Sequence, residues 1–401
     1  MREQQEGSRA VARVVARCRP AVVPAYPITP QTHIVEGLGL MVRAGELSPC
    51  RFLTVESEFA AMSAAIGASA VGTRTYTATA SQGLLYMAEP LFNASGLGLP
   101  IVLTVANRAI GAPINIWNDH SDAMSMRDCG WVQLYAIDNQ HAVDLHVQAF
   151  ALAERISVPV MVCVDGFVLT HASEPIDVPD QDVVDAVLPD IRPRQRLDPA
   201  EPVTIGAMVG PEAFTEVRYL AQLDLLRALS EFPAVVAQLG AHTGREVGPV
   251  TRFGPESART VVIALGSVCG TIRAVLEDGV DTDGVDGDGL GDVALLALTM
   301  YRPFPSAAIR AAVGDAERVI VLERAFAPGA GGIVTADVRG ALTGRDLPLH
   351  TVVAGLGGRP ITEAALRELF ARARRDDLLD VQFLDLDERS VHAARTSGAS
   401  S

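Results

Sequence analysis

The stretch that decides the fold runs from residue 56 to residue 84 and reads ESEFAAMSAAIGASAVGTRTYTATASQGL. The strand pattern RFLTVE before and into it turns into a helix of small residues that starts near Ser57. A second apolar strand follows at residues 75–78, and the turn Ser81-Gln82-Gly83 after it could cap another helix, with Ser81 as the N-cap. Strand, helix and strand in this order are typical of a parallel α/β domain.

The same alternation extends on both sides of this stretch, over residues 1–171. Buried strands are expected at residues 21–26, 75–78, 101–105 and 158–164. Residues 141–155 place Val143, Val147, Phe150 and Ala151 on one face of a helix. The sequence therefore predicts a parallel α/β domain for residues 1–171.

The remainder of the chain divides into three parts. Residues 172–258 are rich in proline, carry one expected helix at 212–231, and are interpreted as a connecting region. Residues 259–375 alternate again, with strands at 260–265, 292–298, 317–323 and 350–355 and helices at 267–276 and 306–313, which predicts a second α/β domain. Residues 376–401 form a tail that is expected to be disordered from about Ser390.

Composition limits the partners of the chain. It has 401 residues, of which 49% are hydrophobic, enough for two or three domains with buried cores. Lys and Arg total 33 against 48 Asp and Glu, and the net charge of -15 argues against general attraction to nucleic acid or to an anionic membrane. We expect the partners to be proteins and small molecules.

Two segments of the sequence bear on location. Residues 90–107 carry no charge, but Pro90, Gly96, Gly98 and Pro100 interrupt them, so they are interpreted as a helix end, a loop and a buried strand. Charged residues break the first 13 positions, which argues against a secretory signal peptide. We expect a cytoplasmic protein without a transmembrane segment.

The cysteines argue against a metal cluster on this chain. The five are scattered, with no CxxC, at Cys18, Cys50, Cys129, Cys163 and Cys269. An iron-sulfur cluster needs about four thiolates at one point, so none is expected here. We interpret the cysteines as small buried hydrophobic residues without disulfides.

Three side chains stand out as able to do chemistry. Glu58 is flanked by apolar residues, which should raise its pKa so that it could share a proton; the alternatives are a first-turn Glu that interacts with the helix dipole, and Glu56 in its place. Thr29 lies between two prolines that stiffen its loop, and a plain structural turn is the alternative. Arg108 follows a buried strand, at the sheet edge where ligands collect; its planar fork suits a carboxylate, or it could form a structural ion pair.

Two further segments are weaker candidates. The run from Asn118 to Asp122, with Asp128 beyond it, has the ligand types of a metal site, but side chains in so short a run diverge and no second cluster completes it, so no metal is predicted. Gly266-Ser267 could form a phosphate loop or could mark tight packing at a strand-helix turn.

Six motifs together resemble one family. They are AYPITP at 25–30, the 56–84 stretch, NRAIGAPINIWNDHSDAMSMRDCGW at 107–131, RPFP at 302–305, ER at 323–324 and GGRPIT at 357–362, in which Pro360 replaces the usual Asp. The chain resembles the α subunit of the 2-oxoacid:ferredoxin oxidoreductases, with pyruvate:ferredoxin oxidoreductase as the nearest named relative. The resemblance covers nearly the whole chain. It implies a thiamine-diphosphate pyrimidine-binding (PYR) domain for residues 1–171 and a transketolase C-terminal-like domain for residues 259–375.

The resemblance also assigns roles to residues. Glu58 matches the glutamate that activates thiamine diphosphate, with Pro27 also at the cofactor; Thr29 and Arg108 match residues that hold the 2-oxoacid. The loop at 118–122 would form part of the wall near the substrate and a partner subunit, and the turn at Ser81 would pack near the cofactor. Ile114, Ile116 and Trp117 could shape a pocket for a larger acyl group or merely pack the loop.

The implied activity is oxidative decarboxylation of a 2-oxoacid, pyruvate by default, to acyl-CoA and CO2 with electrons passed to ferredoxin. Thiamine diphosphate and Mg2+ would be shared with a β subunit, and iron-sulfur clusters would lie only on partner chains such as γ/δ-type subunits or ferredoxin. Two alternatives stay open: a non-oxidative thiamine-dependent decarboxylase or carboligase, and a non-catalytic scaffold subunit.

The acidic, Gly-rich residues 278–292 contain a GDG at 287–289 that opens the family's diphosphate motif. That motif needs a later Asn, and no Asn follows Asn139, so a surface loop is the prediction.

Overall fold

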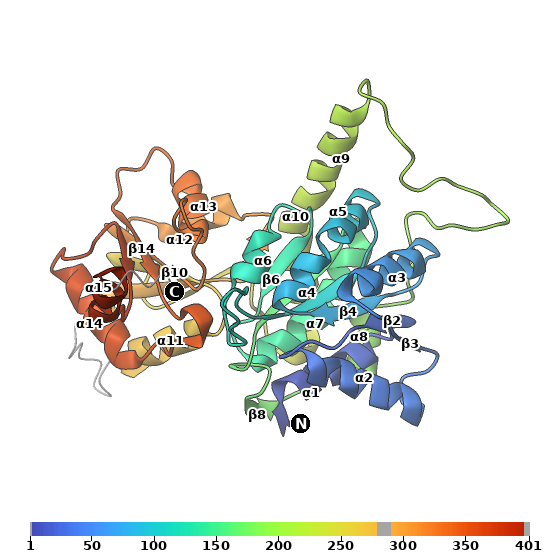
Figure 1. The fold of residues 1–401 in the computed structure, drawn as a ribbon, viewed down its shortest axis with the longest axis horizontal. Helices are drawn as coiled ribbons and strands as arrows, with labels where there is room; N and C mark the ends of the chain where they lie inside the picture. The colour runs from blue at the N-terminus through green and yellow to red at the C-terminus, as the bar shows by residue number, and fades with distance from the viewer. Residues whose placement is uncertain (1, 279–289, 397–401) are drawn as a thin grey trace.

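The computed structural model describes residues 2–278 and 290–396. Two α/β units lie side by side in Figure 1, one built mainly from the N-terminal half and one from the C-terminal half. Each unit is organised around its own sheet. This is the α/β class that the alternating sequence pattern predicts.

The first sheet has the order β12-β6-β7-β5-β4, and a bridge from Val22 to Thr75 extends it to the pair β2-β3. Its strands are parallel except β12, which runs antiparallel to β6. The strands are β2 (Val22–Ala25), β3 (Arg51–Thr54), β4 (Tyr76–Thr79), β5 (Val102–Asn107), β6 (Val132–Tyr135), β7 (Val160–Asp165) and β12 (Met300–Arg302). The four expected strands are therefore present, and β12 is contributed by the C-terminal half.

Helices cover both faces of this sheet because its central strands are buried along their whole length. One face packs on α1 (Gly7–Arg17), α2 (Thr32–Ala44), α7 (Asn139–Ile156), α8 (Gln181–Val187) and α10 (Ala228–Thr243). The other packs on α3 (Glu58–Ala70), α4 (Ser81–Tyr86), α5 (Ala88–Gly96) and α6 (Ser121–Ser125). The apolar core of this second face continues without a break into the C-terminal unit.

Residues 172–258 do more than connect. They supply β8 (Ser173–Ile176), which pairs with β1 (Glu3–Glu6), and β9 (Val250–Phe253), which joins the second sheet. The single helix expected at 212–231 is wrong in extent, because two helices cover this region. Helix α9 (Phe214–Leu226) ends before Arg227, and α10 begins after it, at Ala228. Helix α10 packs on α7, whereas α9 has no buried residue and projects from the body in Figure 1. The domain boundaries at residues 171, 258 and 375 stay predictions.

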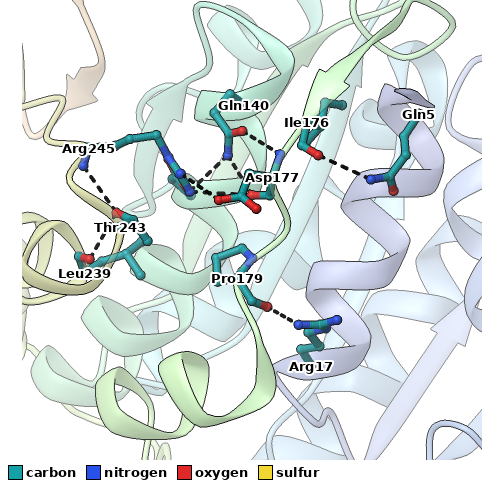
Figure 2. Close-up of polar contacts among 10 residues, drawn as sticks. Gln5, Arg17, Gln140, Ile176, Asp177, Pro179, Leu239, Thr243 and Arg245 are labelled. Atoms are coloured by element: carbon teal, nitrogen blue, oxygen red, sulfur yellow. Dashed lines mark hydrogen bonds and ion pairs between the residues drawn. The ribbon is translucent and has the colours of Figure 1, made fainter. Parts of the chain in front are cut away.

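A buried ion pair holds the end of α10 to α7. Arg245, just beyond α10, donates to both carboxylate oxygens of Asp144, from Nε at 2.7 Å and from Nη2 at 2.8 Å. Figure 2 shows Arg245 also bonding the Asp177 carboxylate, at 3.2 Å. The side-chain amide of Gln140 donates to the Asp177 carbonyl oxygen through its nitrogen and accepts from the Asp177 N–H through its oxygen. The contacts fix the chain after β8 against the first turns of α7.

We expect Asp144→Asn to destabilise the protein without altering its active site. The substitution removes the charge that pairs with Arg245, and hydrogen bonds to charged groups contribute about 1.5–3 kcal/mol each. Because the Arg245 side chain is 20% exposed, solvent screening reduces this contribution, and the expected loss of unfolding free energy is about 1–2 kcal/mol. Urea denaturation measures the loss, and an unchanged midpoint would contradict it.

The second sheet has the order β15-β14-β13-β10-β11-β9, parallel except for β9. Its other strands are β10 (Thr260–Ala264), β11 (Val293–Leu298), β13 (Arg318–Glu323), β14 (Leu349–Val353) and β15 (Val381–Phe383). The helices of this half are α11 (Val268–Asp278), α12 (Ser306–Val313), α13 (Ile333–Ala341), α14 (Glu363–Arg374) and α15 (Glu388–Thr396), with short 3-10 turns at Leu290–Asp292 and Leu356–Gly358. The GDG at 287–289 lies outside the described residues.

Three expectations can be compared with this architecture. The disorder expected from Ser390 is wrong up to Thr396, because helix α15 covers these residues, although none of them is buried. Four of the five cysteines are buried as predicted, Cys50 is half-buried, and all five are free. Among the described residues, no helix is long and apolar enough to cross a membrane.

Candidate active site

The candidate site lies where strands of the first sheet end. The turns after β4 and β5, at Ser81 and Arg108, are at the carboxyl edge of the sheet, and Asp165 ends the neighbouring strand β7. The loop at 26–30 follows β2 on the same edge, because β2 is parallel to β3 and bridges to β4 in parallel. Parallel α/β sheets bind their ligands at this edge.

Glu58 is the first residue of α3. Ser57 caps the helix by accepting a hydrogen bond from the Ala60 N–H at 3.2 Å, and this cap turns the chain from the β3 end into the helix. Glu58 is only 8% exposed, and its carboxylate makes no hydrogen bond or ion pair with any other described residue. The two carboxylate oxygens are not among the fully buried side-chain atoms, so they remain open to a ligand that could supply a partner. Glu56 is exposed, which disfavours it as the alternative to Glu58.

Gly83 leaves room for the Glu58 carboxylate. A Cβ added at Gly83 would lie 2.6 Å from Oε1 of Glu58 and 2.5 Å from Oγ1 of Thr79. Thr79 is fully buried and its hydroxyl has no partner among the described residues. Two polar groups without partners therefore face each other across a position where no side chain fits.

We expect Gly83→Ala to impair catalysis more than stability. The new methyl group would displace the end of the flexible Glu58 side chain, and a shift of about 1 Å in a reacting group can cost about 10²-fold in rate. Alanine is tolerated in a helix, so the fold should persist. Steady-state kinetics beside a thermal melt would measure both effects, and an active Gly83→Ala enzyme would contradict the expected displacement.

Thr29 and Arg108 are in direct contact. The Nη1 group of Arg108 donates to the carbonyl oxygen of Thr29 at 2.9 Å, and its Nε donates to the carbonyl oxygen of Asn115 at 3.4 Å. Arg108 makes no ion pair with a carboxylate among the described residues, so the structural alternative is disfavoured. Burial lowers the pKa of Arg108 and the charge of Asp122 raises it, but the guanidinium stays charged at neutral pH. Pro27 and the side chain of Thr29 are exposed on the same loop.

Asp122 joins two of these turns. Its Oδ2 accepts from the backbone N–H of Ser81 at 2.9 Å and from that of Arg108 at 3.0 Å. Its Oδ1 accepts from Nδ2 of Asn107 at 2.8 Å and from the Ala123 N–H at 2.7 Å. Burial raises the pKa of Asp122 to about 6, although all four donors lower it.

Ser81 is not an N-cap. Ala80 occupies that position, and the Ser81 hydroxyl instead donates to the carbonyl oxygen of Ala109 at 2.5 Å. With φ at +48°, Ser81 adopts a left-handed conformation that its hydrogen bonds must maintain. The Ser81 hydroxyl therefore does not cap the helix but joins the turn after β4 to the turn after β5.

A second buried carboxylate ties the two α/β units together. Asp165 accepts from Nε2 of His120 at 2.6 Å, from Nη1 of Arg324 at 2.8 Å and from both the N–H and the hydroxyl of Ser267. Burial alone would raise the pKa of Asp165, but His120 and Arg324 outweigh it and hold the pKa well below its usual range. The Asp165 carboxylate thus occupies both donors of Ser267, which disfavours a phosphate loop at Gly266-Ser267.

The loop at 107–131 also packs on the GGRPIT segment of the second unit. Asn115 donates to the carbonyl oxygen of Gly357 at 3.1 Å, and Asp119 accepts from the Gly357 N–H at 3.1 Å. The Trp117 side chain covers Gly358, where an added Cβ would lie 2.5 Å from it. Ile114 is 80% exposed, so this part of the loop is uncovered.

The polar side chains of the 118–122 run bond largely within the chain. Asp119, His120 and Asp122 each bond within the chain, and Asp128 lies apart on the surface. Within residues 2–278 and 290–396, no group of three or more His, Cys, Asp or Glu side chains could hold a metal ion.

Sequence reasoning missed the supporting residues. The sequence marked Asp122 only as part of the 118–122 run and Glu323 only as part of the ER motif, and it did not single out Asp165. In the structure Asp122 and Asp165 are buried acceptors of several hydrogen bonds, and Glu323 accepts from the first N–H groups of α13. Asp165 could have been found, because an acidic residue that ends the apolar run VMVCVD must find partners in the core.

Comparisons with known proteins agree with these motifs. Residues 13–238 match the family described as pyruvate flavodoxin/ferredoxin oxidoreductase, thiamine diphosphate-binding, and residues 258–366 match pyruvate:ferredoxin oxidoreductase core domain II. The chain is 43% identical to pyruvate synthase subunit PorA of Methanosarcina barkeri, over 96% of both chains. It is 35% identical to ketoisovalerate oxidoreductase subunit VorA of Pyrococcus abyssi, over 90% of this chain and 91% of that one.

A solved structure shares the fold. It is the 2-oxoglutarate:ferredoxin oxidoreductase from Magnetococcus marinus with 2-oxoglutarate, coenzyme A and succinyl-CoA bound, at a TM-score of 0.70 and 20% identity. The match covers 94% of the present chain and 65% of the longer solved chain. The family matches and the identity to PorA show that this chain belongs to the 2-oxoacid:ferredoxin oxidoreductases, as a subunit of the α type.

Proposed function

We propose that this chain provides the pyrimidine-side half of an active site that decarboxylates a 2-oxoacid oxidatively, with pyruvate as the default substrate. Acyl-CoA and CO2 would be the products, and electrons would pass to ferredoxin. The observation that carries the proposal is Glu58, a largely buried residue whose carboxylate has no partner among the described residues, at the sheet edge where Arg108 and Thr29 meet.

The residues around Glu58 suit thiamine diphosphate. The unpartnered carboxylate can share a proton with a ring nitrogen, and the missing side chain of Gly83 lets the carboxylate take this position. When bound, thiamine diphosphate supplies the electron sink that decarboxylation of a 2-oxoacid requires. Glu58 would hold the proton on the cofactor's pyrimidine ring, and Pro27 on the exposed 26–30 loop would pack against the cofactor.

Arg108 and Thr29 would orient the substrate. The guanidinium uses Nη1 and Nε on backbone carbonyl oxygens, which fixes the direction of Nη2 and leaves it without a partner in the described part of the chain. A carboxylate is the anion that this planar fork binds best. The exposed Thr29 hydroxyl would donate to the substrate from the same loop.

Partner chains would complete the enzyme. A β subunit would hold the diphosphate and Mg2+, and iron-sulfur clusters would lie on partner chains, with γ/δ-type subunits or ferredoxin receiving electrons. Exposed apolar side chains beside Glu58 support a covering partner: Phe59 and Tyr86 lie with ring centroids 6.1 Å apart and are 38% and 59% exposed. The cytoplasmic location expected from the sequence stays a prediction.

The test is 2-oxoacid-dependent viologen reduction by this chain copurified with its co-encoded partners. Thiamine diphosphate, Mg2+ and coenzyme A are supplied, and pyruvate is compared with 2-oxoglutarate and with branched-chain and aryl 2-oxoacids. Reduction that requires both coenzyme A and a 2-oxoacid is the expected result. Release of CO2 without reduction would favour the non-oxidative alternative, and neither product from a cofactor-loaded complex would favour a scaffold.

A further inference from the structure

We propose that Asp122 is a positioning residue, which holds the cofactor-side turn at Ser81 and the substrate-side turn at Arg108 at a fixed distance and orientation relative to each other. The inference rests on the proposed function and deepens it. It concerns a residue that touches neither ligand.

The geometry of Oδ2 carries the proposal. One oxygen atom accepts from two backbone N–H groups that belong to different strand-end turns, at 2.9 Å from Ser81 and 3.0 Å from Arg108. Asp122 is fully buried, so water does not compete for these bonds. The two turns are therefore held to a common point.

Each turn leads directly to a reactive group. Two residues after Ser81, Gly83 lies against the Glu58 carboxylate, and the side chain of Arg108 begins at the second tethered residue. Ser81 adds a second link across the same gap, through its hydroxyl to Ala109. Loss of Oδ2 would remove the acceptor of both N–H groups, so both turns could move. The expected defect therefore lies in the alignment of substrate with cofactor.

The neighbours of Asp122 supply a conservative rescue. In Asp122→Asn, the amide oxygen can keep the two backbone donors while the new NH2 group faces Asn107. The Oδ1 atom of Asn107 has no partner among the described residues, so that amide can turn and accept from the new NH2 group. The N–H of Ala123, which donates to Oδ1 of Asp122 in the parent, loses its acceptor, so the rescue is expected to be partial. Asp122→Ala removes both oxygens and offers no replacement.

The test uses the reconstituted complex and three variants. We expect Asp122→Ala to lower kcat/KM for the 2-oxoacid about 10²-fold or more, and Asp122→Asn to stay within about tenfold of the parent. Asp144→Ala is the matched control, because Asp144 is also a buried carboxylate but bonds Arg245 on the far side of the sheet from α6. It should lower the melting temperature without a comparable change in kcat/KM.

Hydrogen exchange supplies a readout that does not depend on turnover. The amides of Ser81 and Arg108 should exchange faster in Asp122→Ala than in the parent, and not in Asp144→Ala. Unchanged exchange at these two amides would overturn the proposal, and so would a kcat/KM within threefold of the parent for Asp122→Ala. If the parent complex shows no 2-oxoacid turnover, the proposed function fails, while hydrogen exchange still decides whether Asp122 holds the two turns.

Discussion

Glu58→Gln is expected to lower 2-oxoacid-dependent viologen reduction by about 10²–10⁴-fold, the range that one positioned acid-base group contributes. Glutamine keeps the length and nearly the shape of the side chain, so its packing beside Gly83 and Thr79 should be preserved. It cannot exchange a proton with the cofactor. Because the carboxylate has no protein partner, no structural bond is lost, and the melting temperature should change little.

Glu56→Gln is the matched control for this substitution. Glu56 lies two residues earlier and carries the same charge, but it is exposed. We expect its variant to retain parental activity. Equal losses in the two variants would mean that the effect comes from the local charge and not from a proton held at residue 58.

Arg108→Ala is expected to lower kcat/KM for the 2-oxoacid by about 10²-fold or more, chiefly through KM. Removing one member of a hydrogen-bonded charge pair costs about 2–5 kcal/mol, which corresponds to a loss of that size. Arg108→Lys should recover little of it, because a compact ammonium group lacks the planar fork that holds the Thr29 and Asn115 carbonyl oxygens and still directs Nη2 at a carboxylate.

The control for Arg108 is Arg127→Ala, on the same 107–131 loop. Arg127 pairs loosely with Asp128, at 3.8 Å, and donates to the carbonyl oxygen of Met124. We expect its variant to bind the 2-oxoacid like the parent. A parental KM in Arg108→Ala would contradict the assignment of Arg108 to the substrate carboxylate.

Much of the fold could be predicted because local pattern and burial agree. Strand β5 and helix α7 follow from apolar runs and helical periodicity. Strand β12 could not be predicted, because three residues that follow the long run of β11 give no sign that they cross to the other sheet. The break at Arg227 was missed for a related reason: helical patterns continue through it.

The site divides in the same way. Glu58, Thr29 and Arg108 follow from motifs that place a polar group beside chain-bending residues. Asp122 and Asp165 bond to partners that are distant in sequence, such as Ser81 and Arg324, and only the packed structure shows those pairs. The prediction that Ser81 caps a helix was wrong because its hydroxyl bonds Ala109, a tertiary contact that local sequence does not encode.

The most direct test is a structure of the reconstituted complex with thiamine diphosphate and a 2-oxoacid analogue bound. The account predicts the aminopyrimidine ring within hydrogen-bond distance of the Glu58 carboxylate, at about 2.6–3.2 Å, and the analogue's carboxylate on the Arg108 guanidinium. Density for the pyrimidine ring away from Glu58, with Arg108 bonded to a partner chain and not to the analogue, would contradict it.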